Sequence, residues 1–561
     1  MNIEKRVQNF IIKNFVVLSI LFLGLMLRII YVLHLYGSVF YSKPILDAEI
    51  YNSWAHQIAQ GKIISPYAFF LSPLYAYFLG LFYIFFKYSL AISRILNIIL
   101  DLSSCLLIFL IGKKILSRKV GHLSSFIYAL YRPAIFYTGF MLPVNLTIFL
   151  VMLLIYLIVV IGKKRLHHYF LLGILSGLMV LSFSKLIIFI PFVLIYLMIE
   201  RAGNKKSGIT VGKSLTSVIL FLIGFSVLIF LATIHNIIAE QAIEKSSGKS
   251  VFSFSKSSLI FINSSIGYDF YIGNNQRSDG TFKLFDNPFY SDDPRGKKIV
   301  ENILEQKLHS AELRNFWQVK SSLWITENPV KFILLLMKKI LIFFHYREVP
   351  YIYSYEIRLD APLLWIPLFS FSIIAPFAIL GLLLTKKDVK ENWLFSFLII
   401  SILLIALIFY VCDWLRLLAV PILLLYASYT FFDLFRMYKE KKYKILIGRL
   451  VSLSLIFVIT IFHTFWFPFN INRDKSTYHY THGLIYQKER NFRLAESNYK
   501  MALTFENDND IFVYSLSKLF KEEGKIPTAI QYIKFAIQLN PQSLLYKQEL
   551  LDLLNKAKET N

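Results

Sequence analysis

The sequence predicts an all-α polytopic membrane protein with about eleven transmembrane helices, followed by a small α-helical domain. Of its 561 residues, 56% are hydrophobic and only 17% are charged, whereas about a quarter of the residues of a soluble domain are charged. The apolar residues gather in repeated runs close to the ~20 residues that cross a bilayer. Residues 471–561 have no such run and instead repeat a pattern of small and aromatic residues.

The chain is strongly basic, with 60 Lys and Arg against 35 Asp and Glu and a net charge of +25. In a soluble protein this excess would suggest nucleic-acid binding. Here the cations lie in short loops between apolar runs, where they orient membrane helices. We therefore expect a lipid bilayer and no nucleic acid as a partner. Cys105 and Cys412 lie in or beside apolar runs, so they form neither a CxxC pair nor a zinc cluster.

The positive-inside rule predicts that the N-terminus and the basic loops face the cytoplasm, as in a multi-pass protein of the cytoplasmic (inner) membrane. The basic start, residues 1–13, leads into an apolar run with no small-residue cleavage site, which predicts an uncleaved first helix. The basic loops are residues 113–119, 163–168, 201–213, 386–390 and 436–449.

Two apolar stretches do not fit this topology as spans, so we expect both to lie on the external face. Residues 69–86 are short and crowded with Phe and Tyr, which favour the headgroup level. Residues 330–344 carry Lys338 and Lys339 at their centre, where charge is costly inside a bilayer. The odd number of remaining spans places the C-terminal tail outside, in the periplasm. The predicted spans are 14–36, 95–111, 122–140, 143–161, 169–183, 186–200, 214–236, 362–384, 393–411, 415–432 and 450–468.

We therefore divide the chain into a membrane domain, residues 1–470, with external loops 37–93 and 237–361, and an external helical tail, residues 471–561. In the tail, Tyr486, Ala495, Tyr499 and Ala502 recur 34 residues later as Phe520, Ala529, Ile533 and Ala536. This period resembles tetratricopeptide repeats, whose small residues let helices approach closely. A single amphipathic helical hairpin is the alternative. Either would serve to dock a protein partner or acceptor.

Polar residues concentrate at the external edge rather than within the spans. The middles of the predicted spans are nearly free of charge, with Arg28 and Asp101 as the exceptions. Transporters need ionisable groups near the bilayer midplane. The external segments 46–61, 268–281, 345–360 and 413–416 combine polar and aromatic residues. This pattern favours an active site at the membrane surface with access to a lipid-borne substrate.

Asp47 is the candidate general base in the first of these segments, because a base must lie within hydrogen-bond reach of the attacking atom. The alternative is that Asp47 only caps the following helix. The sequence contains no HExxH motif or two-histidine cluster. No cofactor is predicted with certainty, and a divalent cation held by Asp47 or Glu49 stays open.

The run Asp47-Ala48-Glu49-Ile50-Tyr51, with Trp54 and Gly61 and then Ser-Pro-Leu-Tyr at 72–75, resembles a known external loop. It is similar to the first external loop of glycosyltransferases of the GT-C fold that use polyprenyl-phosphate sugars. These include the family 39 protein mannosyltransferases and the aminoarabinose lipid A transferases. Bacterial members with C-terminal tetratricopeptide repeats are the most similar, over about residues 10–470. The resemblance implies transfer of one sugar, with inversion, to a protein, lipid or glycan acceptor on the external face.

The resemblance also implies roles for individual residues. Asp47 would be the base, and Glu49 a second carboxylate that orients the acceptor or holds a cation. Segment 268–280 is similar to a Gly-Asn-Asn and Asp-Gly loop of the family, whose amides suit sugar hydroxyls; a plain Gly- and Asn-rich turn is the alternative. The predicted acceptor- or sugar-binding residues are Tyr51, Trp54, Tyr271, Asn274, Asn275, Glu348 and Tyr353.

Three cations would bind the donor phosphate. Arg347 belongs to an Arg-Glu-Val-Pro run similar to the Glu-x-Pro segment of the family, and Arg416 occupies the outer end of a late helix. A guanidinium pairs two phosphate oxygens at once; for Arg416, snorkelling to the interface is the alternative. Lys185 stands where family members often have Arg, and residues 141–145 read Met-Leu-Pro-Val-Asn where they often have an acidic residue.

Two other classes of function remain. The two departures from the family pattern favour a catalytically degenerate GT-C scaffold or assembly factor that binds partners through its tail. A transporter of lipid-linked sugars fits less well, because the centres of the spans carry little charge.

Overall fold

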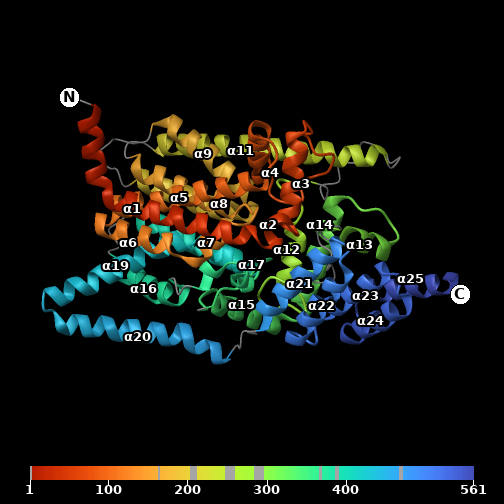
Figure 1. The fold of residues 1–561 in the computed structure, drawn as a ribbon. Coiled ribbons are helices and arrows are strands. Elements are labelled where there is room, and N and C mark those ends of the chain that lie inside the picture. The colour runs from red at the N-terminus through yellow and green to blue at the C-terminus, as the bar shows by residue number, and fades with distance from the viewer. Residues whose placement is uncertain are drawn as a thin grey trace.

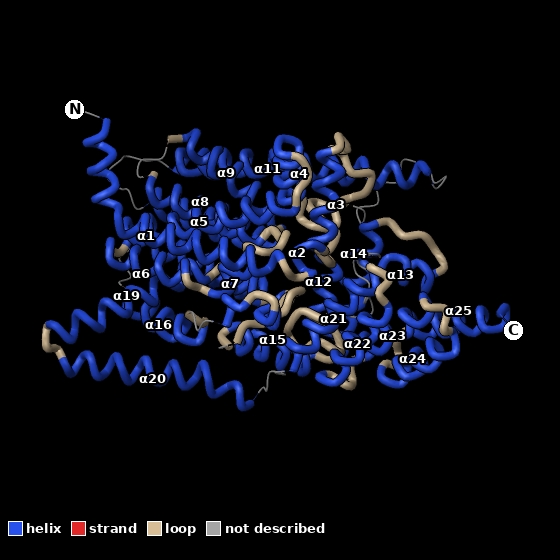
Figure 2. The backbone as a smooth tube through the Cα atoms, viewed as in Figure 1, coloured by secondary structure: helices blue, strands red, loops and turns tan. Residues whose placement is uncertain are grey.

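The computed structural model describes an all-α chain. Helices account for nearly all of its regular structure (Figure 2), and within the described ranges the β-structure is one isolated bridge between Thr281 and Val411. The all-α prediction is therefore confirmed. The described residues are 3–161, 165–202, 211–246, 259–283, 293, 296–345, 347–365, 369–385, 391–466 and 472–560.

The apolar helices confirm a multi-pass membrane protein. Six of those described are long and apolar enough to cross a bilayer, and four apolar helices are shorter. The count of about eleven spans and their orientation remain predictions. The predicted basic loop 386–390, and parts of loops 163–168 and 201–213, lie outside the described residues. The long helices are α1 (Ile3–Tyr36), α5 (Leu90–Ile115), α11 (Val211–Ser246), α17 (Glu391–Ile408), α19 (Val420–Lys439) and α20 (Tyr443–Trp466); the shorter ones are α4 (Leu74–Phe86), α8 (Val144–Val160), α9 (Leu166–Ser182) and α16 (Phe371–Leu384).

The predicted span 122–140 is wrong as a single helix. It divides into α6 (Arg118–Ala129) and α7 (Arg132–Tyr137), with Pro133 in the first turn of α7. Proline cannot donate to the carbonyl four residues earlier, and its ring clashes with that carbonyl, so the first helix ends. The carbonyl of Ala129 accepts instead from Arg28 Nη1, at 2.8 Å.

Three other predicted spans begin with a short separate element. Span 186–200 is η1 (Ser184–Phe189) followed by α10 (Ile190–Ala202), span 415–432 overlaps α18 (Asp413–Leu417) before α19, and span 362–384 opens with η6 (Pro362–Trp365) before α16.

Glycine allows α9 and α11 to pack backbone against backbone. A Cβ atom on Gly173 of α9 would lie 2.1 Å from the carbonyl oxygen of Phe221, and one on Gly224 of α11 would lie 2.2 Å from that of Phe170. Any larger residue would force the helices apart. Small residues at such contacts are a common means of association between membrane helices.

The two charged residues predicted inside spans bind each other. Arg28 Nε lies 2.5 Å from Asp101 Oδ2, and Tyr128 donates to the other carboxylate oxygen at 2.8 Å. All three side chains are fully buried. The pair therefore joins α1, α5 and α6, which is how buried charges are usually accommodated in membrane proteins.

Short helices gather with the tail at one end of the long helices (Figure 1). We call this the tail end of the bundle. In Figure 1 it lies to the right, where the first short helices of the chain meet the blue C-terminal helices. The short helices there include α3 (Asp47–Ala59), α12 (Ile266–Gly273), α13 (Lys297–Leu304) and α14 (Ser310–Glu327).

The external position of residues 330–344 stays a prediction, but the structure accounts for one of its two lysines in another way. These residues form α15 (Pro329–Phe343), and the side chain of Lys339 is buried in protein. Its Nζ donates to Asn274 Oδ1 at 2.9 Å and to the carbonyl of Leu407 at 2.8 Å. Burial lowers the pKa of Lys339 to about 7. The charge is thus satisfied by neighbouring segments rather than by the headgroup region.

The described residues of the tail, 472–560, form five helices, so the tail is larger than the single hairpin considered as an alternative. The repeated positions, from Ala495 to Ala536, form its buried core, as the 34-residue pattern predicts. Its classification as tetratricopeptide repeats stays a prediction. The helices are α21 (Asn472–Lys488), α22 (Phe492–Phe505), α23 (Asp510–Glu522), α24 (Ile526–Leu539) and α25 (Leu544–Thr560).

The first tail helix shares a core with the membrane domain. Tyr478 and Ile485 of α21 belong to the main hydrophobic cluster. Tyr478 also donates to Asp360 Oδ1 at 3.1 Å, and Ser354 donates to Asp474 Oδ1 at 2.9 Å. The tail is therefore fixed against the membrane domain.

Replacing Gly483 by alanine is expected to destabilise the tail by about 1–3 kcal/mol through overpacking. The added Cβ would lie 2.4 Å from the ring of Tyr499, which is fully buried and donates to Gln487 Oε1 at 2.7 Å. A lower midpoint of thermal unfolding would show the effect. Gly448→Ala is the matched control, because nothing lies within 4 Å of its added Cβ. Equal midpoints for the two variants would contradict the prediction.

Candidate active site

A cavity of about 50 Å³ at the tail end of the bundle brings together three segments identified in the sequence. Asp47 and Tyr51 come from the first, Val144 from the second and Lys185 from the third. The other lining residues include Ser72, Asn263, Ser265, Asp269, Tyr351, Tyr410 and Trp414.

Asp47 is held by a residue from a distant loop. It is the first residue of α3 and is 6% exposed, and its Oδ2 accepts a hydrogen bond from the hydroxyl of Tyr351 at 2.8 Å. The N-cap position belongs to Leu46, whose φ is 52° and which makes no side-chain cap. The carboxylate thus stands in the first helical turn, where the helix dipole favours negative charge. Asp47 is therefore not the N-cap residue that the capping alternative requires, and its role as the base stays a prediction.

Lys185 brings a positive charge into the same cavity. Its Nζ lies 3.1 Å from Asp269 Oδ2 and 3.4 Å from the hydroxyl of Tyr410, which in turn donates to Asp269 Oδ1 at 3.3 Å. Ser265 donates to Asp269 Oδ2 at 3.1 Å. Nζ also lies 4.6 Å from the ring centre of Phe409, within cation–π range. This network orients the Lys185 ammonium group, which is placed to bind an anion in the cavity.

Glu49 does not share the site of Asp47. Its Oε2 lies 2.5 Å from Lys488 Nζ of the tail, and it does not line the cavity. Within the described ranges, no group of three or more His, Cys, Asp or Glu side chains could hold a metal ion. A cation bound by both Asp47 and Glu49 would therefore need these carboxylates to rearrange.

Arg416 and Glu348 form a buried ion pair outside the cavity lining. Arg416 Nη2 is bonded to Glu348 Oε2 and donates to the carbonyl of Arg347 at 2.9 Å, while Nη1 donates to that of His345 at 2.7 Å. Tyr131 donates to Glu348 Oε1 at 3.0 Å. Arg416 is 1% exposed, so it does not snorkel. The pair braces the loop that leads to Tyr351, and Arg347 lies on the same loop.

A second buried carboxylate stands beside this pair. Asp413 Oδ1 accepts from the hydroxyl of Tyr137 at 2.5 Å and from the backbone N–H of Trp414 at 2.7 Å. Burial, opposed by these hydrogen bonds and reinforced by the nearby charge of Glu348, raises the pKa of Asp413 to about 7. The hydrogen bond to Asp413 positions the backbone of Trp414, a residue that lines the Asp47 cavity.

The side-chain amides of Asn274 and Asn275, which were predicted to bind sugar, donate hydrogen bonds to backbone carbonyls. Asn274 donates to the carbonyls of Phe270 and Ile408, at 2.9 and 2.7 Å, and Asn275 donates to that of Tyr271 at 2.7 Å. Neither lines the Asp47 cavity. Their geometry therefore fits the alternative of a structural turn better than sugar binding.

The predicted aromatic residues divide into two groups. Tyr51 lines the cavity, and its hydroxyl donates to the carbonyl of Ser72 at 3.3 Å. The other three do not line it: Trp54 packs on Phe69 with ring centres 5.3 Å apart, Tyr271 packs on Trp317 at 4.6 Å, and Tyr353 stacks on Phe140 at 3.9 Å.

Sequence reasoning missed Asp269, Tyr351 and Tyr410 as members of the site. Asp269 and Tyr351 do lie in segments singled out for their polar and aromatic content. That composition gave no sign that segments so far apart converge on Asp47, or which side chain of each faces the cavity.

Comparison with known proteins supports the resemblance read from the motifs. Residues 71–230 match the family model described as dolichyl-phosphate-mannose-protein mannosyltransferase. The match includes residues 72–75, 141–145 and 183–185 and begins after Asp47. A search of curated proteins found no match.

Among solved structures, an oligosaccharyltransferase of Archaeoglobus fulgidus in complex with an inhibitory peptide and a dolichol-phosphate is similar over 83% of this chain and 56% of its own, at 14% identity and a TM-score of 0.39. Its apo form covers 80% and 55%, at 12% identity and a TM-score of 0.41. This chain thus spans little more than half the length of these proteins. The family match and the apolar helices together confirm that the chain is a multi-pass membrane protein resembling the glycosyltransferases of the GT-C fold.

Proposed function

We propose that the protein transfers a sugar from a polyprenyl-phosphate donor to an acceptor on the external face of the cytoplasmic membrane. The observation that carries this proposal is the cavity that joins Asp47 and Lys185 at the tail end of the bundle. The Asp47 carboxylate is suited to accept a proton, and the Lys185 ammonium group is suited to bind a phosphate. The match to a mannosyltransferase family model over residues 71–230 supports the same reaction class.

The proposed reaction is a single displacement with inversion. Asp47 accepts the proton of the acceptor hydroxyl as the acceptor oxygen bonds to the anomeric carbon. The bond between that carbon and the phosphate oxygen breaks, and its electrons leave with the polyprenyl phosphate. Lys185 stabilises the charge of this leaving group, which is most effective in a site that excludes water. Asp269 and Tyr410 hold Lys185 in place until the phosphate arrives.

A degenerate scaffold remains a second candidate because of one observation. Val144, which stands where family members often have an acidic residue, lines the cavity and brings no charge to it. If that missing carboxylate were essential to catalysis, the chain would only bind partners.

Transfer of radiolabelled sugar from membrane polyprenyl-phosphate donors by the purified protein tests the proposal, with wild type beside Asp47→Asn. Transfer that disappears in the variant would support the enzyme and its base together. No transfer from any donor pool, by folded protein whose tail still binds a partner, would favour the scaffold. Movement of lipid-linked sugar between leaflets without an acceptor would indicate a transporter.

Lys185→Gln is expected to lower kcat/KM for the donor about 10²–10³-fold, because it removes a charge aimed at the leaving phosphate. The substitution also leaves Asp269 buried without its cation, so the fold needs a control. The double variant Lys185→Gln, Asp269→Asn removes both charges and should restore stability but not activity. Donor kinetics and thermal unfolding separate the two effects. Wild-type kinetics in Lys185→Gln would rule out the phosphate role.

A further inference from the structure

A second and larger cavity, of about 230 Å³, lies beneath the tail. Its walls come from the loop segments around residues 277–283 and 351–352 and from helices α21 and α23 with the turn before α23. It is therefore built jointly by the membrane domain and the tail.

The two cavities adjoin at Tyr351. Tyr351 lines both of them, and its hydroxyl donates to Asp47 Oδ2 at 2.8 Å. Leu46, the neighbour of Asp47 in the chain, lines the larger cavity. The cavity at Asp47, of about 50 Å³, is much smaller than the cavity of about 230 Å³ beneath the tail. A substrate that reaches Asp47 from the larger cavity would therefore pass Tyr351.

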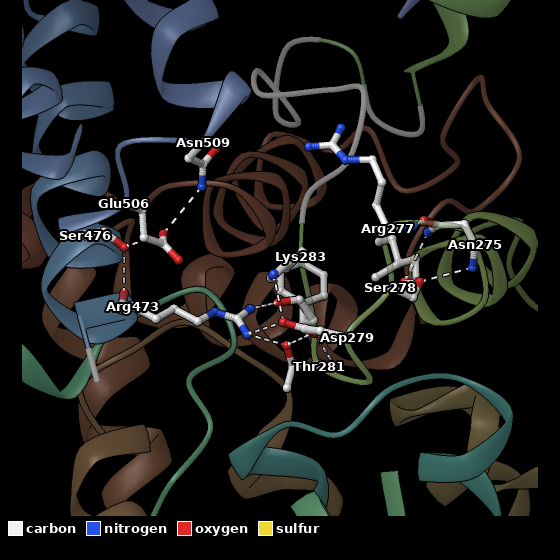
Figure 3. A network of polar contacts seen from close by, with 12 residues as sticks. Asn275, Arg277, Ser278, Asp279, Thr281, Lys283, Arg473, Ser476, Glu506 and Asn509 are labelled. Atoms are coloured by element: carbon white, nitrogen blue, oxygen red, sulfur yellow. Dashed lines mark hydrogen bonds and ion pairs between the residues drawn. The ribbon is translucent and has the colours of Figure 1, made fainter. Parts of the chain in front are cut away.

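Arg473 attaches the tail side of this cavity to the membrane domain through hydrogen bonds and an ion pair (Figure 3). Arg473 of α21 is bonded to Thr281 Oγ1 and to the carbonyl of Phe282, and its Nη1 lies 3.5 Å from Asp279 Oδ2. Lys283 Nζ lies 2.7 Å from the same oxygen. Burial alone would raise the pKa of Asp279, but Arg473 and Lys283 outweigh it and hold the pKa below its usual range.

A second ion pair attaches the tail to the beginning of the same loop. Arg277 binds the carboxylate of Asp510, the first residue of α23, through both terminal nitrogens. Both helices that line the cavity are thus anchored to segment 277–283. The cavity is a built site rather than a gap between loosely docked parts.

The chemistry of the lining favours a polypeptide over a glycan. The apolar lining residues are Leu46, Phe282, Ile352, Ile511 and Phe512. Hydroxyl and amide groups come from Thr477, Tyr480, Thr481 and Asn509, and charges of both signs come from Arg277, Lys283, Arg473, Glu506 and the exposed Asp508. Apolar side chains beside scattered polar groups suit an extended peptide, whose backbone bonds while its side chains pack. Stacked helical repeats commonly present such surfaces to protein partners.

We infer that this cavity receives the acceptor as an extended polypeptide segment, and that Tyr351 is the positioning residue between it and Asp47. The inference rests on the proposed glycosyl transfer. The tail is then a wall of the acceptor site, and Tyr351 releases Asp47 as the acceptor hydroxyl takes its place.

Filling the cavity tests this inference. Thr477, on α21, lines the cavity, whereas Thr504, on α22, is exposed and does not line it. The assay uses radiolabelled membrane polyprenyl-phosphate sugars with synthetic Ser- and Thr-containing peptides. Thr477→Trp should raise the KM for peptide at least about tenfold, a loss of about 1.4 kcal/mol in binding. Thr504→Trp should leave it unchanged, and thermal unfolding should show that both variants are folded.

A charge reversal at the rim gives a second test that does not depend on a buried substitution. Asp508→Lys should lower the preference for Lys-containing over Glu-containing peptides about 2- to 5-fold, as expected for an exposed ion pair. Asp552→Lys, at an exposed position of α25 outside this cavity, should leave the preference unchanged.

The outcomes separate the inference from the proposed function. Equal peptide KM values in wild type and Thr477→Trp, with transfer that still needs Asp47, would overturn the acceptor site and keep the enzyme. Transfer to lipid or glycan but to no peptide would overturn the polypeptide assignment. Absence of any Asp47-dependent consumption of donor in the wild type would overturn the proposed function itself.

Discussion

Asp47→Asn is expected to lower the rate of sugar transfer about 10²–10⁴-fold, the usual contribution of a general base. Asparagine has the same shape and can still accept the hydrogen bond from Tyr351, so the fold should be kept. Only the ability to take a proton is lost. Single-turnover transfer, with donor binding measured separately, would show an unchanged donor affinity and a much slower chemical step.

Glu49→Gln tests whether Glu49 contributes to catalysis as much as Asp47 does. Glu49 is half-exposed and paired with Lys488, so the geometry predicts a much smaller loss than for Asp47→Asn. An equal loss for both variants, restored by added divalent cation, would indicate that the two carboxylates bind a metal together. An Asp47→Asn variant that transfers at the wild-type rate would exclude Asp47 as the base.

Arg416→Met is expected to destabilise the protein by about 3–5 kcal/mol, because it leaves Glu348 charged and buried without its partner. The three carbonyls of the 343–347 loop would lose their donor as well. The double variant Arg416→Met, Glu348→Leu should recover most of the loss, since a buried pair replaced by apolar residues of similar size is often neutral. Thermal unfolding in detergent measures both.

This variant also separates two roles for Arg416. If the guanidinium bound the donor phosphate, as the family resemblance implies, Arg416→Met would raise the KM for donor and leave the unfolding midpoint near that of the wild type. The buried contacts predict the reverse, namely a loss of stability that precedes any effect on the donor.

Much of the fold follows from the order of residues, because helices that cross a bilayer need long apolar runs. The repeat in the tail likewise predicted which small residues are buried, since close helix packing excludes larger ones. The breaks near Ala129 and Ser184 were less predictable. A proline signals an interruption, but which turn ends depends on what can satisfy the freed carbonyl, here Arg28 from a different helix.

The candidate site was only partly predictable for a related reason. Asp47, Tyr51 and Lys185 lie in segments with a recognisable motif or a recognisable departure from one. Tyr351 reaches Asp47 across 304 positions of sequence, which no local pattern reveals. Asn274 and Asn275 show the opposite error. Their amides suit sugars in principle, but sequence alone cannot tell that nearby backbone groups already occupy them.

The contacts between Arg473 and segment 279–283 affect the order in which parts of the protein can form during its synthesis. Thr281 and Arg473 are separated by 192 residues. At about 5–20 residues per second, a ribosome makes the second about 10–40 s after the first. During that interval Asp279 lacks its contact with Arg473, and the cavity beneath the tail has only one wall. The proposed acceptor site is thus among the last parts of the nascent protein to form, well after most of the membrane helices.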